Sequence, residues 1–543
     1  MKFFYFPLLR AFLFFLLFTG GAWSHVAYAV TPEILKTLST GDNSERIAAI
    51  DALVSTGDVD ALPILQALLD GTLHVAPRGE KVIILDKEVA HNALTKQIID
   101  PVPAGLEKIT INNRVRRILD SALAALKLSS SDSQVRLAAA EQLQDQANED
   151  FLPLIETVLK KEQDSDVKIA LSLAKAKMQL KNADATLRLE AVRVLAQSSK
   201  ESTKAALLAM IEKDASGNYQ EVDVAVRSEI KRSLAEIDSR LLTAEYIGRV
   251  FSGISLGSIL LLAALGLAIT YGLMGVINMA HGELLMIGAY TTYMVQVLFK
   301  SYWPEAFDLY LLVALPAAFI VSALVGMAME RSVIRYLYGR PLETLLATWG
   351  ISLILIQTVR TIFGAQNVEV VNPAWMSGGF ALVSNLVLPY NRIAIIVFSM
   401  IVLVLIWVLL NRTRLGLFVR AVTQNRTMAD CAGVPTRKVD MWAFGLGSGV
   451  AGLGGCALSQ IGNVGPDLGQ SYIVDSFMVV VLGGVGQIAG TVFAALGLGV
   501  VNKFLEPYAG AVLAKIFILV FIIIVIQKRP QGLFALKGRT VEN

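Results

Sequence analysis

The chain has 543 residues, of which 54% are hydrophobic and 17% are charged, and its formal net charge is +3. A charged fraction well below the ~25% of soluble domains, together with long uncharged runs, excludes an ordinary soluble protein and indicates a membrane protein. The small positive charge does not indicate nucleic-acid binding, because the arginines lie in short loops between apolar segments, where they report topology.

The first residues have the pattern of an export signal. The first ten residues contain Lys2 and Arg10 and are followed by the apolar stretch 11–18. Ala27-Tyr28-Ala29 then has the small-x-small form of a cleavage site. The apolar core is too short to span a bilayer comfortably, so we expect residues 1–29 to be a signal peptide that is removed after Ala29. An uncleaved anchor is the alternative, and both place the following region outside the cytoplasm.

Residues 30–243 are polar enough for water and carry three copies of one helical pattern. In each copy apolar residues recur three and four apart, and a short polar turn leads to a second apolar helix. The first helices are expected at Ser44–Leu53, Ser133–Leu143 and Ala185–Leu195, the second at Leu62–Leu69, Phe151–Leu159 and Lys204–Ile211, and a closing helix at Val222–Ile237. The pattern is similar to HEAT repeats, in which stacked helix pairs bury each other's faces. It fits a partner-docking surface or a purely structural role.

Between the first two copies, His74–Asn113 interrupts this rhythm. Val82–Leu85 and Ile109–Ile111 are short β-prone runs among glycines and prolines, which predicts a small hairpin-like insertion. His74 and His91 have no partners at metal-ligand spacing, so we expect surface histidines. The chain's two cysteines, Cys431 and Cys456, lie outside residues 30–243, so no disulfide framework holds that domain together.

Residues 244–543 are predicted to be an all-α, polytopic membrane domain. Most of their apolar segments are near the ~20 residues that a bilayer core requires. The segments are Ser252–Thr270, Met279–Leu298, Leu309–Met329, Leu345–Val359, Ile393–Leu410, Met441–Leu458, Ser476–Val501 and Ala511–Ile526.

The distribution of arginine predicts the orientation of this domain. The loops after the third and fifth segments are basic, whereas the loop Phe363–Arg392 between them carries only Arg392. Basic loops stay in the cytoplasm, which agrees with an exported N-terminal domain. The tail Lys528–Phe534 is also basic and should be cytoplasmic, but counting Ser476–Val501 as one span would leave it outside. We therefore expect this segment to double back in a broken-helix turn at Gly483, Gly484 and Gly486. Such a turn needs protein or a water-lined cavity around it, which places it near the transport path or its cytoplasmic gate.

The stretch Tyr271–Tyr290 carries polar residues between two apolar runs. Asn278, His281, Gly282 and Glu283 are candidate pathway residues, because ionisable groups at membrane depth are costly unless they face a partner or a wet cavity. The alternative is a helix cap at the membrane surface, with Asn278 at the helix start and Glu283 near its positive end. A metal-dependent hydrolase is excluded, because one membrane histidine cannot build the usual zinc site.

Two further features lie in the sixth segment and in the basic loop before it. The glycines of the segment predict close helix packing, and a sliding helix is the alternative; they are Gly445, Gly447, Gly449, Gly452, Gly454 and Gly455. Residues 414–433 are amphipathic, which fits a helix on anionic lipid or a docking helix for a cytoplasmic partner. The chain has no phosphate-binding loop, so any ATP must be hydrolysed by another subunit.

Three motifs resemble one known family over residues 247–534. Y-G-L-M-G-V-I-N-M-A-H-G-E, followed by M-I-G-A-Y, is similar to the opening signature of the permease subunits of branched-chain amino-acid and urea ABC importers. R-T-R-L-G-L-F-V-R-A-V-T-Q-N-R-T-M-A-D-C-A-G-V is similar to that family's ATPase-coupling loop, and K-R-P-Q-G-L-F to its end. On this resemblance the positions of the coupling pattern are Arg414, Gly416, Arg420, Ala421, Asn425, Ala429 and Gly433.

The resemblance implies a type II-like ABC importer permease in the bacterial inner membrane, without a cofactor or metal of its own. Its partners would be a second homologous permease subunit, two cytoplasmic ATPase subunits, a periplasmic solute-binding protein and membrane lipid, and no nucleic acid. The long N-terminal extension resembles that of urea permeases, which makes urea the first choice of solute. The alternatives are branched-chain amino acids, short amides, or a membrane-anchored repeat scaffold that transports nothing.

Overall fold

The computed structural model describes residues 31–534 except 57–60, 77–80, 87–88, 104, 147, 214–216 and 384–385, and the predicted signal peptide lies outside them. The chain divides into two compact units, residues 1–239 and 240–543. The division falls inside the 51-residue helix α11 (Val224–Met274), near the predicted boundary at residue 243. The predicted closing helix Val222–Ile237 therefore does not end there, because its apolar pattern runs on into the first membrane segment.

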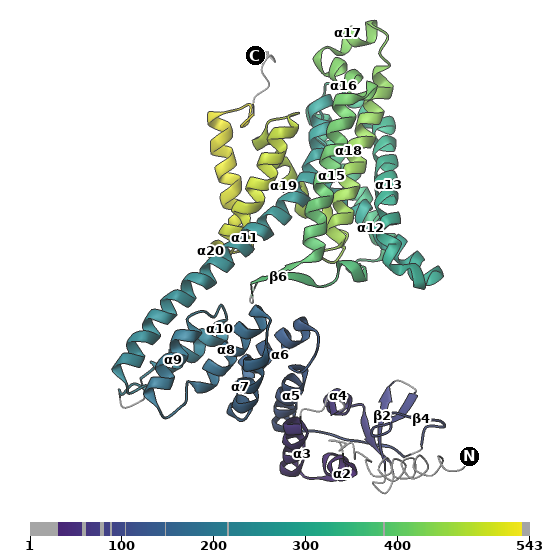
Figure 1. Ribbon diagram of the computed structural model, residues 1–543. Helices are drawn as coiled ribbons and strands as arrows, with labels where there is room; N and C mark the ends of the chain where they lie inside the picture. The colour runs from purple at the N-terminus through teal and green to yellow at the C-terminus, as the bar shows by residue number, and fades with distance from the viewer. Residues whose placement is uncertain are drawn as a thin grey trace, which may run out of the picture. The chain divides into compact units, whose positions relative to one another are not determined.

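Nine α-helices precede α11 among the described residues, and the three predicted helix pairs correspond to α3 with α4, α6 with α7, and α9 with α10. Leu53, Leu143 and Leu195 occupy the same place in each copy and are fully buried. Helices α5, α6, α8 and α9 each pack against the next (Figure 1). The helices are α2 (Pro32–Thr40), α3 (Asn43–Thr56), α4 (Leu62–Asp70), α5 (Asn113–Lys127), α6 (Ser133–Gln146), α7 (Leu152–Lys161), α8 (Ser165–Gln179), α9 (Ala185–Leu195) and α10 (Glu201–Met210).

An aspartate and an arginine four residues later recur at helix starts in this unit. Asp132 Oδ1 accepts from the Gln134 N–H at 2.9 Å, and Arg136 donates to the Ser130 carbonyl and to Glu162. Asp184 and Arg188 repeat this arrangement, with Glu221 as the acceptor. The hydrogen bond from Arg136 lowers the pKa of Glu162 to about 2. The starts of α6 and α9 are thus fixed by the same aspartate cap and the same arginine–glutamate contact.

The insertion is a five-stranded antiparallel sheet of order β4-β3-β2-β1-β5, not the predicted hairpin. Ile109–Ile111, predicted as β-prone, follows the last strand instead of forming one. Propensity missed the four strands other than Val82–Asp86, of two to four residues each, because strands this short carry little pattern of their own. The strands are β1 (Leu73–Val75), β2 (Val82–Asp86), β3 (Val89–Asn92), β4 (Ile98–Ile99) and β5 (Glu107–Lys108).

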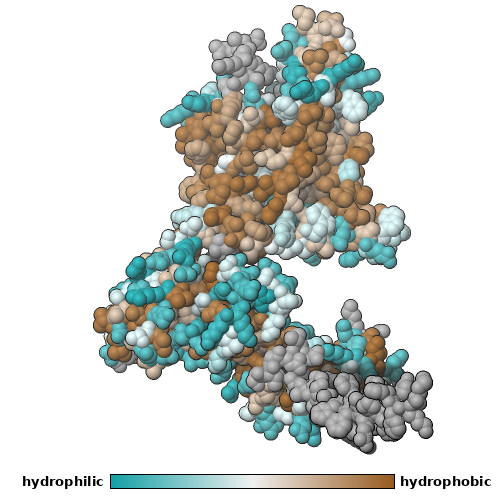
Figure 2. Space-filling model, viewed as in Figure 1, coloured by the Kyte–Doolittle hydropathy of each residue, from teal (hydrophilic) through white to brown (hydrophobic). Residues whose placement is uncertain are grey.

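The second unit is a bundle of long apolar helices, and six helices among the described residues are long and apolar enough to cross a membrane. Figure 2 shows the apolar residues in a band, with hydrophilic residues beyond both of its ends. After α11 come α12 (His281–Tyr302), α13 (Tyr310–Ser332), α14 (Pro341–Phe363), α15 (Tyr390–Arg412), α16 (Arg414–Gln424), α17 (Arg426–Cys431), α18 (Thr436–Ser459), α19 (Leu468–Gly483) and α20 (Ile488–Lys528), with three short 3₁₀ helices, η4 (Pro304–Leu309), η5 (Ile334–Leu337) and η6 (Ala374–Met376), and the hairpin β6 (Gly379–Val383) and β7 (Leu386–Pro389).

The last apolar stretch folds back twice. α19 ends at Gly483 and α20 begins at Ile488, with Gly484 and Gly486 at positive φ between them. The tail beyond α20 returns to the same place, because the Leu533 N–H donates to the Leu482 carbonyl at 2.9 Å. Both ends of the 41-residue α20 therefore lie near Gly484, which requires the reversal at Gly510, where φ is 75° and ψ is 163°. Figure 1 shows the end of α20 on the same side of the bundle as α16 and α17.

Candidate functional site

The polar stretch of the sequence forms a break between α11 and α12. α11 ends at Met274, residues 275–280 are not helical, and α12 begins at His281. His281 Nε2 lies 3.0 Å from the Ala263 carbonyl of α11, and the Met279 N–H donates to Thr348 Oγ1 of α14 at 3.2 Å. The break is therefore held by neighbouring helices, which is the condition for irregular backbone at membrane depth.

The break lies level with the middle of its neighbours. Ser352, the twelfth of the 23 residues of α14, donates to Glu283 Oε1 at 2.9 Å. Asn278 and His281 are fully buried, and Glu283 is 1% exposed. Asn278 Oδ1 does accept from the Ala280 N–H at 3.0 Å, as a cap would. Because these side chains are buried at mid-helix height, a cap at the membrane surface does not describe them.

Glycines bring the helices around this break into backbone contact. A Cβ at Gly282 would lie 2.5 Å from the Gly469 carbonyl oxygen of α19. Gly266 of α11 faces Gly447 of α18, with the His281 ring beside them, and Gly288 of α12 faces Gly452 of α18. The glycines of α18 therefore serve close packing against α11 and α12, while Gly282 and Gly469 bring α12 against α19.

Several buried polar atoms in this interior have no hydrogen-bond partner among the described residues: Asn278 Nδ2, His281 Nδ1, Glu283 Oε2, Tyr290 Oη, Ser255 Oγ and Ser448 Oγ. Because a carbonyl only accepts, His281 Nε2 carries the hydrogen and Nδ1 of the neutral ring is an acceptor. Buried polar atoms are normally paired. Donors and acceptors in this arrangement suit a small polar molecule. No group of three metal ligands occurs within the described part of the chain.

A stripe of hydroxyl groups on α14 was not predicted. Thr344, Thr348 and Ser352 are buried and recur every fourth residue, so they share the face of α14 that meets the break. Ile356 and Val359 continue that face as apolar side chains. Beyond them, Arg360 pairs with Asp467 at 2.6 Å, just before α19 begins. The i, i+4, i+8 spacing of hydroxyls in an apolar segment was the available signal.

The predicted turn at Gly483, Gly484 and Gly486 does not lie among the buried polar side chains of the break. It packs against the C-terminal tail. A Cβ at Gly484 would lie 2.6 Å from the Phe534 carbonyl oxygen, and a Cβ at Gly483 would lie 2.5 Å from the Gly490 carbonyl carbon. Gly486 contacts Gly272 of α11, six residues before Asn278. The structure thus joins the turn to the C-terminal motif and to the end of α11, and not to the buried side chains of α12.

The basic loop forms two short helices, α16 and α17. Gly416 packs against the end of α15, where Arg420 Nη1 donates to the Leu410 carbonyl at 3.1 Å. Asn425 caps α17 by accepting from the Met428 N–H at 2.9 Å, and Gly433 ends the loop at φ 85°. Ala429 is buried, Ala421 accepts from the Asn425 N–H at 3.1 Å, and Arg414 begins α16.

The pattern residues of this loop therefore set its shape, and other side chains form its exposed surface. Leu417 and Met428 are 57% and 66% exposed. Cys431, which lies within the coupling-loop motif, is also exposed.

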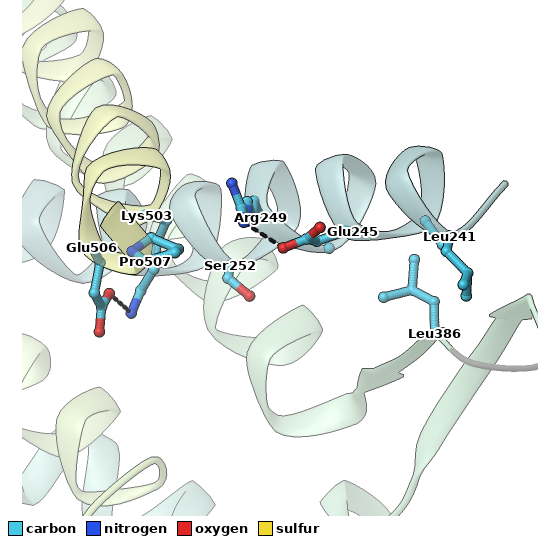
Figure 3. Close-up of a pocket in the computed structure, with 10 residues that line it drawn as sticks. Leu241, Glu245, Arg249, Ser252, Leu386, Lys503, Glu506 and Pro507 are labelled. Carbon is cyan, nitrogen blue, oxygen red and sulfur yellow. Dashed lines mark hydrogen bonds and ion pairs between the residues drawn. The ribbon is translucent and has the colours of Figure 1, made fainter. Parts of the chain in front are cut away.

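A pocket of about 670 Å³ opens between α11, β7 and the first part of α20 (Figure 3). Its charged groups are already paired along their own helices, Arg249 with Glu245 and Lys503 with Glu506. The pocket is therefore close to neutral and lies apart from the break.

Comparison with known proteins agrees with the motifs. The family described as "Branched-chain amino acid transport system / permease component" matches residues 249–526, just over half of the chain. The chain belongs to this family. Its similarity to the permease protein BraD of Pseudomonas aeruginosa is 29% identity over 53% of this chain and 95% of that protein. For LivH of Escherichia coli K12 the identity is 27% over the same shares, and for a probable LivH of Methanocaldococcus jannaschii it is 25% over 51% and 88%.

Membership makes the second unit a transport permease component of the membrane and not an enzyme. An ATPase and a binding protein are the general partners of such a component in an ABC system. The match begins at residue 249, so the first unit lies outside it. No solved structure matches the chain significantly.

Proposed function

We propose that this chain is the permease subunit of an ATP-driven importer that carries urea across the bacterial inner membrane by alternating access. A second homologous permease, two cytoplasmic ATPase subunits and a periplasmic solute-binding protein complete the transporter. The end of the bundle that bears α16, α17 and the tail is cytoplasmic, because the basic loops lie there. The first unit is then an exported helical-repeat domain, similar to HEAT repeats, that docks a partner.

The observation that carries the proposal is the break at Asn278–Glu283. It places donors and acceptors without partners at the middle of a membrane bundle, where unpaired polar groups are costly. Asn278 and His281 are fully buried and Glu283 is 1% exposed, so a solute would reach them only if the helices moved. A small solute that both donates and accepts hydrogen bonds matches them, and alternate opening of the two ends would give it a path.

Urea fits these groups better than leucine does. Its carbonyl can accept from Asn278 Nδ2, and its NH₂ groups can donate to Glu283 Oε2 and to hydroxyl oxygens of α14. A leucine side chain requires an apolar pocket of its own size, whereas the wall that faces the break carries Thr348 and Ser352. The N-terminal extension also supports urea, by resemblance. The names of the relatives support branched-chain amino acids as the second candidate.

Uptake of labelled urea and labelled leucine, at low external concentration in cells with and without this gene, tests the proposal. We expect deletion to abolish urea uptake alone, and we expect Asn278→Ala and Glu283→Gln to reduce it at normal abundance in the membrane. Loss of leucine uptake alone would show an amino-acid importer. Unchanged uptake of both solutes, with no ATPase co-purifying, would favour the scaffold.

A further inference from the structure

Five polar side chains form one network where α17 meets the ends of α13 and α18. Glu330, in the last turn of α13, is fully buried and accepts from Arg335 Nη2 at 3.2 Å and from Tyr338 Oη at 3.1 Å. The guanidinium of Arg426, the first residue of α17, lies 4.8 Å from the centre of the Tyr338 ring. It also pairs with both carboxylate oxygens of Asp440, the fifth residue of α18, which is 2% exposed.

Arg426 is therefore shared between the segment after α13 and the start of α18. A buried carboxylate is tolerated when a cation pairs with it, and removing the cation leaves an uncompensated charge. If α17 moved alone, Asp440 would stay behind, buried and unpaired. The less costly movement carries α17, Tyr338 and the start of α18 together.

The two helices at this network are joined to the break at Asn278–Glu283. α13 and α18 are in contact through their smallest residues, since a Cβ at Gly326 or Gly452 would overlap Ser448 or Ser322. Ser322 Oγ of α13 also donates to the Leu284 carbonyl at 3.2 Å. Leu284 directly follows Glu283. A displacement of α13 with α18 thus reaches the first turn of α12 through backbone and hydrogen-bond contacts.

We propose that the network of Glu330, Arg335, Tyr338, Arg426 and Asp440 couples the ATPase-facing loop to the transport path, with Arg426 as the positioning residue that makes α13 and α18 follow α17. This inference rests on the proposed function, because it needs a solute path at the break and an ATPase at the loop. The inference adds a route between the solute path and the ATPase site. The coupling-pattern residues of α16 and α17 shape the loop but do not connect it to the break.

Arg426→Gln, Asp440→Asn and their double variant test the route in the complete complex, reconstituted in liposomes. The readouts are solute imported per ATP hydrolysed, ATPase subunits retained on purification, and melting temperature. Arg437→Gln is the matched control, because Arg437 is an exposed arginine in the first turn of α18 that forms no ion pair among the described residues. The solute is urea, or leucine if the uptake test selects it.

We expect Arg426→Gln to lower solute imported per ATP about ten-fold or more while the ATPase subunits stay bound and Arg437→Gln changes nothing. The double variant separates coupling from stability, because it leaves no unpaired charge. Its melting temperature should recover relative to Arg426→Gln, while its import per ATP stays low. Recovery of both would show a structural ion pair and overturn the proposal, and so would normal import per ATP in Arg426→Gln.

Failure of the proposed function has a different outcome. If the wild-type complex imports neither solute, the proposed function fails and so does the route that depends on it. If the wild-type complex imports urea or leucine and all variants match it, only the network is wrong.

Discussion

Ser352 and Glu283 form the most informative pair of side chains in the interior. Ser352 Oγ is the only donor to that carboxylate among the described residues, and the second carboxylate oxygen accepts from none of them. Ser352→Ala would leave both oxygens without a partner among the described residues, at a cost of about 1–3 kcal/mol for an unsatisfied buried group. We expect solute uptake to fall by about ten-fold or more.

Thr358→Ala on the exposed face of the same helix is the control for this prediction, because Thr358 donates only to the Ile354 carbonyl. Uptake by Thr358→Ala should equal that of the wild type when both are measured at equal abundance in the membrane. Equal uptake by Ser352→Ala would remove α14 from the path.

The sequence predicted one side of this pair and missed the other. Asn278, His281 and Glu283 stand out because ionisable and amide groups are rare inside apolar stretches. Ser352 does not, because a hydroxyl in a membrane helix is usually satisfied by the carbonyl one turn earlier, so its presence in the sequence indicates little. Its spacing from Thr344 and Thr348 was the only sequence signal that separates it from Thr358, and the contact with Glu283 is what gives that spacing a meaning.

At the scale of the helices, α12 and α19 meet at glycine against glycine. A Cβ at Gly282 would lie 2.5 Å from the Gly469 carbonyl oxygen, and neither backbone can yield without moving a helix. Overpacking of this kind costs about 1–3 kcal/mol. We therefore expect Gly282→Ala to lower the melting temperature of the purified protein and to reduce uptake.

Gly350→Ala is the matched change for this prediction, since a Cβ at Gly350 of α14 would meet nothing within 4 Å. Alanine favours a helix over glycine, so this variant should melt at the wild-type temperature or slightly above it. Equal melting of Gly282→Ala and Gly350→Ala would mean that α12 and α19 are free to separate at this contact.

Helices were predictable where one apolar period runs unbroken. Leu309–Met329 begins one residue before α13 and ends three residues before that helix does, and Ile393–Leu410 lies within α15, two or three residues short at each end. The reversal at Gly510 lies in the gap between the predicted segments Ser476–Val501 and Ala511–Ile526, where a cytoplasmic tail required the chain to turn back. Hydropathy does not predict that α11 continues past Ile237. The charged first part and the apolar second part of this helix have different hydropathy because they have different surroundings, although the backbone is one helix.

At the scale of the whole chain, the orientation of the second unit decides which partners can reach it. Cys431 is exposed on α17, whereas Cys456 is buried in α18, so the native cysteines already report on the side that bears the basic loop. If this loop is cytoplasmic, a membrane-impermeant maleimide should label Cys431 in inverted vesicles and not in intact cells. Cys456 should stay unlabelled in both.

A cysteine at the opposite end completes the topology test. Ala365→Cys in a Cys431→Ser background places a thiol in the exposed segment after α14. It should be labelled in intact cells. The reverse labelling of both positions would put α16 and α17 outside, where no ATPase can dock. The arginine distribution, the coupling assignment and the import direction would then all be wrong together, because each depends on the same face of the bundle meeting the cytoplasm.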